Sequence, residues 1–225
     1  MSALCFYLKG DRIMAEPKEL YYEKRGKLLV KNLQSRHFEA YYCSNRDEAL
    51  AKALELIPEG SSIGWGGALS AKQIGLIDAV KNGNYRAIDR DSCSNAEEKE
   101  QMQRESLFAD AFIMGANALS LDGQMVSIDG SGNRVCALIY GPKSVIVIAG
   151  MNKVMDNLEL AYHRARTVAA PMNQQRFQLP NPCTTTGVCA DCKCETSICN
   201  QIVITRNCRP AGRIKFILVG EELGI

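Results

Sequence analysis

Five of the ten cysteines of this chain fall within one short stretch, and thiols at such spacing suggest metal binding. Residues 181–200 read NPCTTTGVCADCKCETSICN, a segment rich in proline, glycine, threonine and asparagine that has no core of its own. Packing does not account for so many thiols in a polar loop, whereas thiolates are the preferred ligands of zinc and iron–sulfur clusters. We therefore expect a metal centre held by Cys183, Cys189, Cys192 and Cys199, with Cys194 left over.

The identity of the metal depends on how the cysteines are paired. A structural zinc ribbon presents two separate C-x2-4-C pairs, but this loop has one such pair, Cys189 and Cys192, flanked by single cysteines. Single cysteines around one C-x2-C suit an iron–sulfur cluster at least as well. We favour a [4Fe–4S] cluster, and zinc is the alternative.

A second candidate site is the polar segment DGSGNR at residues 129–134. Gly130 and Gly132 allow a backbone or a ligand to approach closely, and Asp129, Asn133 and Arg134 stand beside them with hydrogen-bonding groups. A plain polar loop between two strands is the alternative, but a glycine pair followed at once by Asn-Arg favours a binding site. Arginine matches a carboxylate with two parallel hydrogen bonds, so Arg134 is the expected anchor of an acidic ligand and Asp129 the acid/base candidate.

A glycine-rich segment, GWGG, provides the third group of candidate residues. It follows an expected strand at residues 61–65 and precedes a helix for which Ser70 is the expected cap. Free backbone amides in such a loop can hold an anion or a carbonyl oxygen, although glycines also serve tight turns. Trp65 is either a core residue or a flat wall for a ligand, and its glycine neighbours favour the wall. The expected contacts are Gly64, Trp65, Gly66, Gly67 and Ser70.

Asn152 and Lys153 stand where the expected strand at residues 144–149 passes into a helix. Ligands of open α/β sheets bind beyond the carboxyl ends of the strands, and GWGG occupies a similar end. Most lysines are solvated surface residues, but this placement predicts that Lys153 adds positive charge beside Arg134. Asn152 is expected to contact the same ligand.

The elements that position these residues alternate between strand and helix. We expect strands at residues 37–43, 61–65, 85–89, 110–114, 125–128, 135–140, 144–149, 201–205 and 213–219. We expect helices from residue 17 and at residues 46–57, 71–83, 96–108 and 154–170, the last one stopped by Pro171. Asp122-Gly123 predicts a hairpin turn. Cys43 and Cys136 lie in apolar runs and are expected to be buried.

Length and composition favour one α/β domain. Residues 1–15 form an expected leader, and residues 16–225 form the domain, with the cysteine loop inserted between a helix and a final hairpin. A net charge of +2 and a pI near 8.0 do not favour nucleic-acid binding. No apolar run is long enough for a membrane span and no secretory signal is evident, so we expect a cytoplasmic protein.

Several segments together resemble the lactate-utilisation (LUD) domain family, and more narrowly its branch with a C-terminal cysteine cluster. They are YYEKR, GWGG, DG…DGSGNR, GPKSVIVIAGMNKV, AAPMN and the cysteine loop. The resemblance implies a three-layer α/β/α sandwich with a mostly parallel central sheet, similar to sugar-phosphate isomerases and CoA transferases. It also implies a link to iron–sulfur-dependent oxidation of L-lactate to pyruvate, with other iron–sulfur subunits as partners.

The fold does not fix the reaction, and two functions stay open at this point. CoA transferases of this fold use a glutamate nucleophile, and no glutamate occurs at residues 61–90 or 115–150, which argues against thioester exchange. The first function is that of an enzyme or enzyme subunit acting on a small carboxylate. The alternative is a metabolite-sensing module whose metal loop is structural or reports redox state. A third and weaker possibility is that the cysteine loop is a zinc knuckle that binds RNA. The chain could also form a homo-oligomer.

Overall fold

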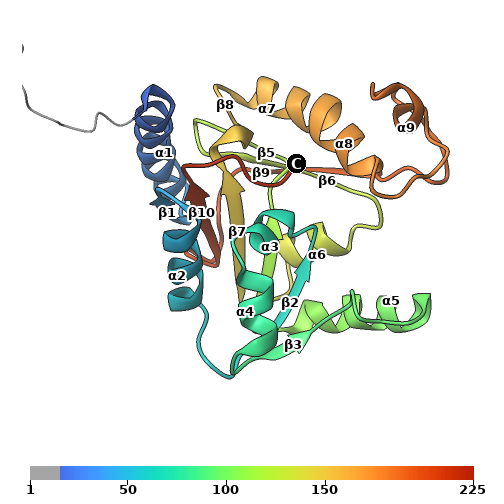
Figure 1. Ribbon diagram of the computed structural model, residues 1–225, viewed down its shortest axis with the longest axis horizontal. Coiled ribbons are helices and arrows are strands. Elements are labelled where there is room, and N and C mark those ends of the chain that lie inside the picture. Colours follow the sequence, from blue (N-terminus) through green and yellow to red (C-terminus); the bar gives the residue numbers. More distant parts are fainter. Residues whose placement is uncertain (1–15) are drawn as a thin grey trace, which may run out of the picture.

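The computed structural model describes residues 16–225, and a six-stranded parallel sheet forms its centre (Figure 1). The leader expected at residues 1–15 lies outside the described residues. The strand order is β1-β10-β7-β4-β2-β3, and every neighbouring pair is parallel. The strands are β1 (Glu39–Cys43), β2 (Ser62–Gly66), β3 (Arg86–Ile88), β4 (Ala111–Gly115), β7 (Ser144–Gly150) and β10 (Ile214–Val219).

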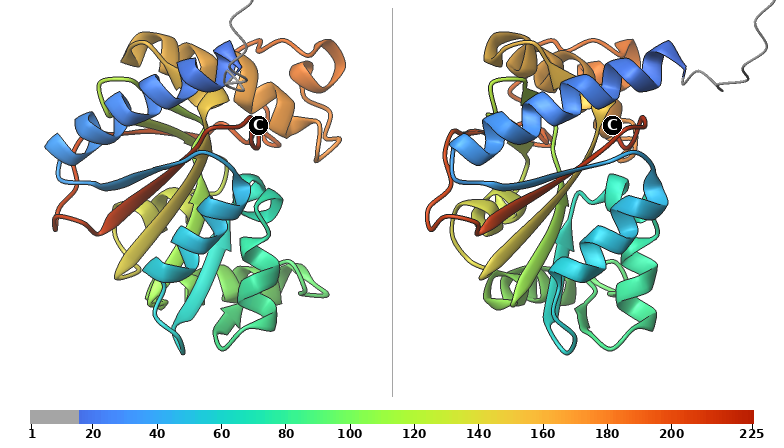
Figure 2. Two further views of the ribbon diagram at one scale, coloured as in Figure 1. Left: turned by 60° about the vertical axis from the view of Figure 1, so that its left-hand side comes forward. Right: turned by 90° about the vertical axis from the view of Figure 1, so that its left-hand side faces the viewer.

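Side chains alternate between the two faces of this sheet and bury both of them. In β4, Ala111 and Ile113 point to one core, whereas Phe112 and Met114 point to the other. The first core lies under α2 (Arg46–Leu56), α3 (Leu69–Gln73) and α4 (Leu76–Asn82). The second lies under α1 (Pro17–Ser35) and α6 (Asn133–Ile139), and Figure 2 shows α1 and α2 on opposite faces. This is the expected α/β sandwich with a parallel central sheet.

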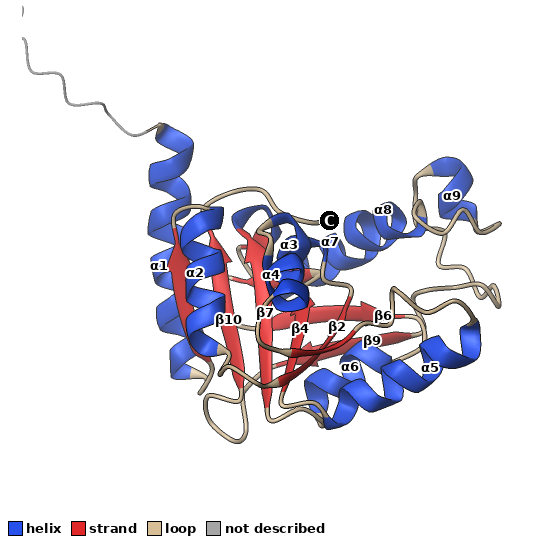
Figure 3. Ribbon diagram, turned by 60° about the horizontal axis from the view of Figure 1, so that its bottom comes forward, coloured by secondary structure: helices blue, strands red, loops and turns tan. Residues whose placement is uncertain are grey.

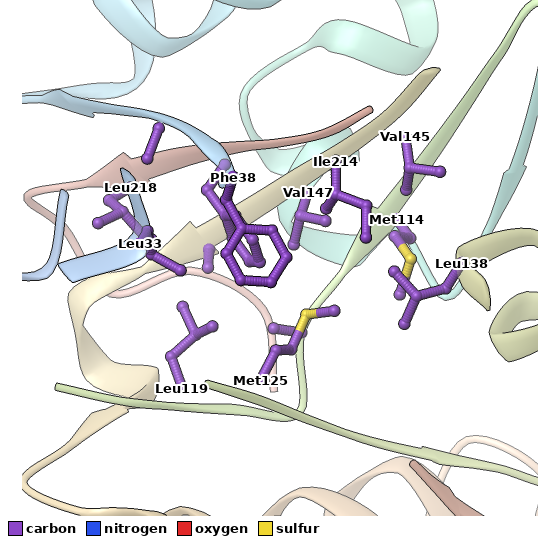
Figure 4. Packing of buried hydrophobic residues seen from close by; sticks show 14 of the residues in the cluster. Leu33, Phe38, Met114, Leu119, Met125, Leu138, Val145, Val147, Ile214 and Leu218 are labelled. Carbon is purple, nitrogen blue, oxygen red and sulfur yellow. The ribbon is translucent and has the colours of Figure 1, made fainter. Parts of the chain in front are cut away.

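A second, four-stranded sheet crosses beside the first, and the sequence analysis did not foresee it. Its order is β8-β5-β6-β9, and Figure 3 shows β6 and β9 running across the end of the central sheet. The strands are β5 (Ala118–Ser120), β6 (Met125–Asp129), β8 (Val154–Met155) and β9 (Gln201–Thr205). Leu119 and Met125 of this sheet pack into the second core beside Met114 and Leu33 (Figure 4).

The other face of the small sheet is covered by helices. These are α7 (Leu158–Arg164), a π-helical turn (Ala165–Ala169) and α8 (Ala170–Gln174), whose alanines pack on Val126 and Ile128. The helix expected at residues 154–170 therefore begins later, after β8, and continues past the expected stop, because Pro171 lies in the first turn of α8, where a missing N–H is tolerated.

The strand expected at residues 135–140 is wrong, because these residues form α6. Gly132 caps this helix in the left-handed region, with φ of 86°. Val135, Ala137 and Leu138 of α6 are buried, whereas Tyr140, the residue after the helix, is exposed to solvent. A short apolar run fits a buried strand and a buried helix equally well, so the pattern alone did not separate them.

Five further expectations need correction. The strands at residues 201–205 and 213–219 are present, but they form no hairpin because β9 joins the small sheet and β10 the central one. The helix expected at residues 71–83 is broken by Gly75 into α3 and α4, and Ala68, not Ser70, is the cap of α3. The helix expected at residues 96–108 ends as α5 (Ala96–Glu105), and a 3-10 turn (Ser106–Phe108) follows. Cys136 is exposed, whereas Cys43 is buried as expected.

Two short elements complete the described chain, a 3-10 turn (Met151–Lys153) after β7 and the helix α9 (Pro182–Thr186) in the cysteine loop. None of the helices in residues 16–225 has the length and apolar character needed to cross a membrane.

Candidate functional site

Three neighbouring strands of the central sheet end in glycine at the same edge. They are β2 at Gly66, β4 at Gly115 and β7 at Gly150. The segments that follow β2 and β7 carry Gly67, Ser70, Asn152 and Lys153, so the carboxyl ends of these strands are the place to look for a ligand.

Arg134 lies at the centre of this edge and is buried. Its Nε donates to Asp129 Oδ2 at 3.4 Å, its Nη1 to the Gly115 carbonyl at 3.4 Å, and its Nη2 to Asn117 Oδ1 at 3.0 Å. Nη2 also donates to the carbonyl of Ile128. The structure thus brings Asp129 and Arg134 together, and four hydrogen bonds tie the guanidinium to the ends of β4 and β6.

The glycines next to Arg134 give its side chain room. A Cβ at Gly67, whose φ is 57°, would stand 3.2 Å from Arg134 Cδ, and a Cβ at Gly66 would stand 3.1 Å from Phe112. Both positions therefore serve the packing around the arginine. Asn133 follows Gly132 in the first turn of α6.

Asp129 is fixed by its own loop. Its Oδ1 accepts the amide of Gly132 at 2.9 Å, while Oδ2 accepts from Arg134. Only 8% of the residue surface is exposed. Both carboxylate oxygens of Asp129 therefore have a hydrogen-bond donor.

Lys153 approaches the same edge from β7 and is 3% exposed. Its Nζ donates to Ser70 Oγ at 3.2 Å and to the carbonyl of Ala116 at 3.1 Å. Burial, together with the charges of Arg164 and Arg134, lowers the pKa of Lys153 from 10.5 to about 7. Ser70 is 1% exposed and belongs to α3.

Arg164 is a neighbour of Lys153 that the sequence analysis missed. It stands at the end of α7, and its guanidinium donates to the carbonyls of Asn117 at 2.6 Å and Asn152 at 3.2 Å. Its Nη2 donates to no other residue within the described part of the chain. The available signal was spacing, because Arg164 follows the buried Ala161 by three residues and so lies on the same helix face.

The segment at residues 221–225 lies over Lys153 and Ser70. Leu223 N donates to Asn152 Oδ1 at 3.1 Å and Gly224 N donates to Gln73 Oε1 at 2.6 Å. A Cβ at Gly224 would come within 2.5 Å of Ser70 Oγ and 2.6 Å of Lys153 Nζ. Figure 3 shows this end of the chain between α3 and α7. We call residues 221–225 the cover segment.

Gly64 and Trp65 lie away from this edge. Both belong to β2, and a Cβ at Gly64 would stand 2.5 Å from Ser106 Oγ on the neighbouring turn. Trp65 is 3% exposed in the core under α2–α4, where its Nε1 donates to Asp91 Oδ2 at 3.2 Å. The indole is a core residue here, in contrast to the ligand wall we expected.

The cysteine loop forms a second site beside α7 and α8. A hollow there is lined by the four cysteines of the predicted set together with Arg166, Pro171 and Ser197, while Cys194 is not among its lining residues. Burial, together with the nearby Cys189, Cys183 and Cys192, raises the pKa of Cys199 to about 11. All four cysteines of the predicted set therefore line one hollow.

These thiols suit a metal centre by their chemistry. Within residues 16–225, no three His, Cys, Asp or Glu side chains are close enough to form a ready-made metal site. The four cysteines line a common hollow, however, and soft thiolates suit zinc or an iron–sulfur cluster. Binding would have to draw the loop inward around the metal.

Other polar groups surround the thiols. Arg166 Nη2 lies 3.7 Å from Cys189 Sγ, and Asn181 Nδ2 lies 4.0 Å from Cys192 Sγ. Such N–H donors stabilise thiolate ligands and tune the metal they hold.

The cysteine loop is joined directly to the loop of Asp129. Asn200, next to Cys199, donates its N–H to the carbonyl of Asp129 and its Nδ2 to that of Gly130, both at 3.0 Å. A Cβ at Gly130 would stand 3.1 Å from Ile198 Cα, so the glycine lets the two loops touch. The two candidate sites thus share a boundary.

The chain was also compared with known proteins. The model of the LUD domain matches residues 26–219. A crystal structure of a DUF162 family protein from Deinococcus radiodurans is 11% identical and superposes with a TM-score of 0.49, covering 89% of this chain and 97% of that one. A search of curated proteins finds no match.

Proposed function

Because the chain belongs to the LUD domain family, we propose that it acts on a small 2-hydroxy or 2-oxo carboxylate, with L-lactate and pyruvate as the pair. In this proposal it serves iron–sulfur-dependent oxidation of lactate, alone or with partner iron–sulfur subunits. The observation that carries it is the gathering of Lys153, Arg164 and Arg134 at one edge of the sheet.

The carboxylate of the substrate is assigned to Arg164. The guanidinium of Arg134 already donates four hydrogen bonds to protein groups. Nη2 of Arg164, in contrast, donates to none of the described residues. A guanidinium suits a carboxylate because it donates two parallel hydrogen bonds. Arg134 then acts by holding Asp129 and the ends of β4 and β6 in place.

Proton transfer from the substrate hydroxyl is assigned to Lys153. Its pKa of about 7 leaves a large neutral fraction at neutral pH, as a general base requires. Asp129 was the sequence-based candidate, but its bonds to Gly132 and Arg134 favour a fixed carboxylate that orients its neighbours.

A [4Fe–4S] cluster, or zinc as the alternative, would be held by Cys183, Cys189, Cys192 and Cys199. A cluster would supply an electron acceptor next to the Asp129 loop, whereas zinc would only order the cysteine loop.

The test is anaerobic purification of the full chain, metal analysis and a visible spectrum, followed by calorimetric titration with L-lactate and pyruvate. We expect both acids to bind and Arg164→Met to weaken binding at least tenfold, while the exposed-arginine control Arg176→Met leaves it unchanged. Reduction of an artificial electron acceptor by L-lactate would support the enzyme. Binding without any turnover, even after iron–sulfur reconstitution, would favour the sensing module, and absence of binding would reject the substrate class.

A further inference from the structure

The amine of Lys153 has only neutral partners among the described residues. They are a serine hydroxyl and a backbone carbonyl, and no carboxylate forms an ion pair with Lys153 in residues 16–225. A buried ammonium without a counterion is costly, so such lysines lose their proton. The charges that face it, Arg164 and Arg134, act in the same direction.

Loss of the proton changes what the side chain can do. A neutral, desolvated lysine amine is a nucleophile toward carbonyl carbon. The two arginines that disfavour its positive charge would attract the carboxylate of a substrate to the same place. A carbonyl carbon attached to a carboxylate is thus the electrophile that this edge of the sheet suits best.

We infer that Lys153 forms an imine with a 2-oxo acid, and that Ser70 assists as its hydrogen-bond partner. The inference takes its substrate class from the proposed function. The Nζ lone pair attacks the keto carbon and forms a C–N bond, and one amine proton passes to the former carbonyl oxygen. The second amine proton follows as the C=N double bond forms, and the oxygen leaves as water. The step needs no oxidant or reductant, and its atoms balance.

The cover segment must open for this reaction. Leu223 and Gly224 are held by two hydrogen bonds, to Asn152 and to Gln73, over a Lys153 that is 3% exposed. Glu221 and Glu222 fix the start of the segment through hydrogen bonds with Met151, Arg46 and Lys18, and Leu223 is 1% exposed. Access to Nζ therefore depends on a local displacement of Gly224 and Ile225. Reactivity of Lys153 should therefore increase when the cover segment is displaced.

The test is reductive trapping of the full chain with pyruvate and cyanoborohydride, followed by peptide mapping. We expect a reduced adduct on Lys153 that forms at least tenfold faster than on the exposed Lys143. Lys153→Arg should remove this adduct, and Lys143→Arg should leave it. Ser70→Ala should slow trapping, and Gly224→Ala should accelerate it because the added Cβ displaces the cover segment.

Two outcomes separate this inference from the proposed function. If pyruvate binds by calorimetry but modifies Lys153 no faster than Lys143, in wild type and in Gly224→Ala alike, the imine is rejected and the function stands. If neither pyruvate nor lactate binds and no adduct forms, both are rejected. Because the wild-type peptide map decides the matter, instability of Lys153→Arg would not obscure it.

Discussion

At the scale of single residues, the candidate site is defined by cations that lack a full set of anionic partners. Arg134 has one carboxylate, Asp129, and otherwise meets carbonyl and amide oxygens, and Lys153 meets a hydroxyl and a carbonyl. Buried charge of one sign is unfavourable for folding. A negatively charged ligand would relieve it, which is why this edge is a better candidate than the glycines alone.

The buried lysine makes stability depend on pH. The folded-state pKa of Lys153 is about 7, below the unfolded value of 10.5, so the unfolded chain binds more protons between these two values. The free energy of unfolding therefore rises with pH between pH 7 and 10.5. Below pH 7 the lysine is charged in both states, and the full cost of burying its charge destabilises the folded protein. For Lys153→Met this dependence disappears.

We expect Lys153→Met to have a higher free energy of unfolding than wild type at pH 7. This difference should decrease by at most about 1.4 kcal/mol per pH unit between pH 7 and 10. Urea denaturation at several pH values measures it, with Lys143→Met as the exposed control. A difference that is independent of pH would show that Lys153 keeps its proton in the folded protein.

Arg134 should behave as a buried clamp. Its loss in Arg134→Met removes the ion-pair partner of Asp129 and one donor from each of the carbonyls of Gly115 and Ile128, so we expect about 3–5 kcal/mol of destabilisation. The exposed Arg176→Met should change the free energy of unfolding by less than about 0.5 kcal/mol. Equal effects of the two substitutions in urea denaturation would contradict the clamp.

Sequence reasoning found these charged residues but misjudged what some of them contact. The motif DGSGNR located Asp129 and Arg134 because polar groups beside paired glycines are informative without coordinates. Trp65 was wrongly expected to contact a ligand, because the sequence does not show that helices α2–α4 cover the face of β2 from which its side chain projects. Arg164 was missed because its partners, the carbonyls of Asn117 and Asn152, are distant in sequence.

At the scale of elements, turns were more predictable than topology. Asp122-Gly123 does join the antiparallel pair β5 and β6, as its turn chemistry predicted. The second sheet escaped notice because β5 and β8 have only three and two residues, too few for a periodic pattern. The strands at residues 201–205 and 213–219 were recognised, but strand pairing over long separations leaves no local signal.

The hairpin turn also determines how the small sheet meets α1. Gly123 has a φ of 91°, and a Cβ there would stand 2.9 Å from the backbone of Asn32. Gly60 has a φ of 76° with no atom within 4 Å of its added Cβ. Substitution of Gly60 therefore tests backbone strain alone, whereas substitution of Gly123 tests strain together with a steric clash.

We expect Gly60→Ala to cost about 1 kcal/mol from strain alone, and Gly123→Ala to cost roughly 3 kcal/mol because α1 must also shift. Chemical denaturation of both variants measures this difference. Equal costs would show that the hairpin moves freely against α1.

At the scale of the whole molecule, two sheets bring the two candidate sites together. The central sheet supplies Lys153 and the glycine-ended strands, and the small sheet supplies Asp129 at the end of β6. The return of the chain through β9 places Asn200 against Asp129 and Gly130, one residue after Cys199. A metal bound by Cys199 would therefore restrain the loop that carries Asp129 and Arg134.

This connection predicts long-range ordering by the metal. Loading the anaerobic protein with iron and sulfide, or with zinc, should slow amide hydrogen exchange in residues 129–134 as well as in residues 183–201. Asn200→Ala should retain the metal but reduce protection in residues 129–134, because the Nδ2 hydrogen bond to the carbonyl of Gly130 is lost while the backbone bond to Asp129 remains. Strand β1, at the far edge of the central sheet, should exchange at the same rate in both states and serves as the internal reference. Protection confined to residues 183–199 would mean that the cysteine loop orders by itself and that the two sites act independently.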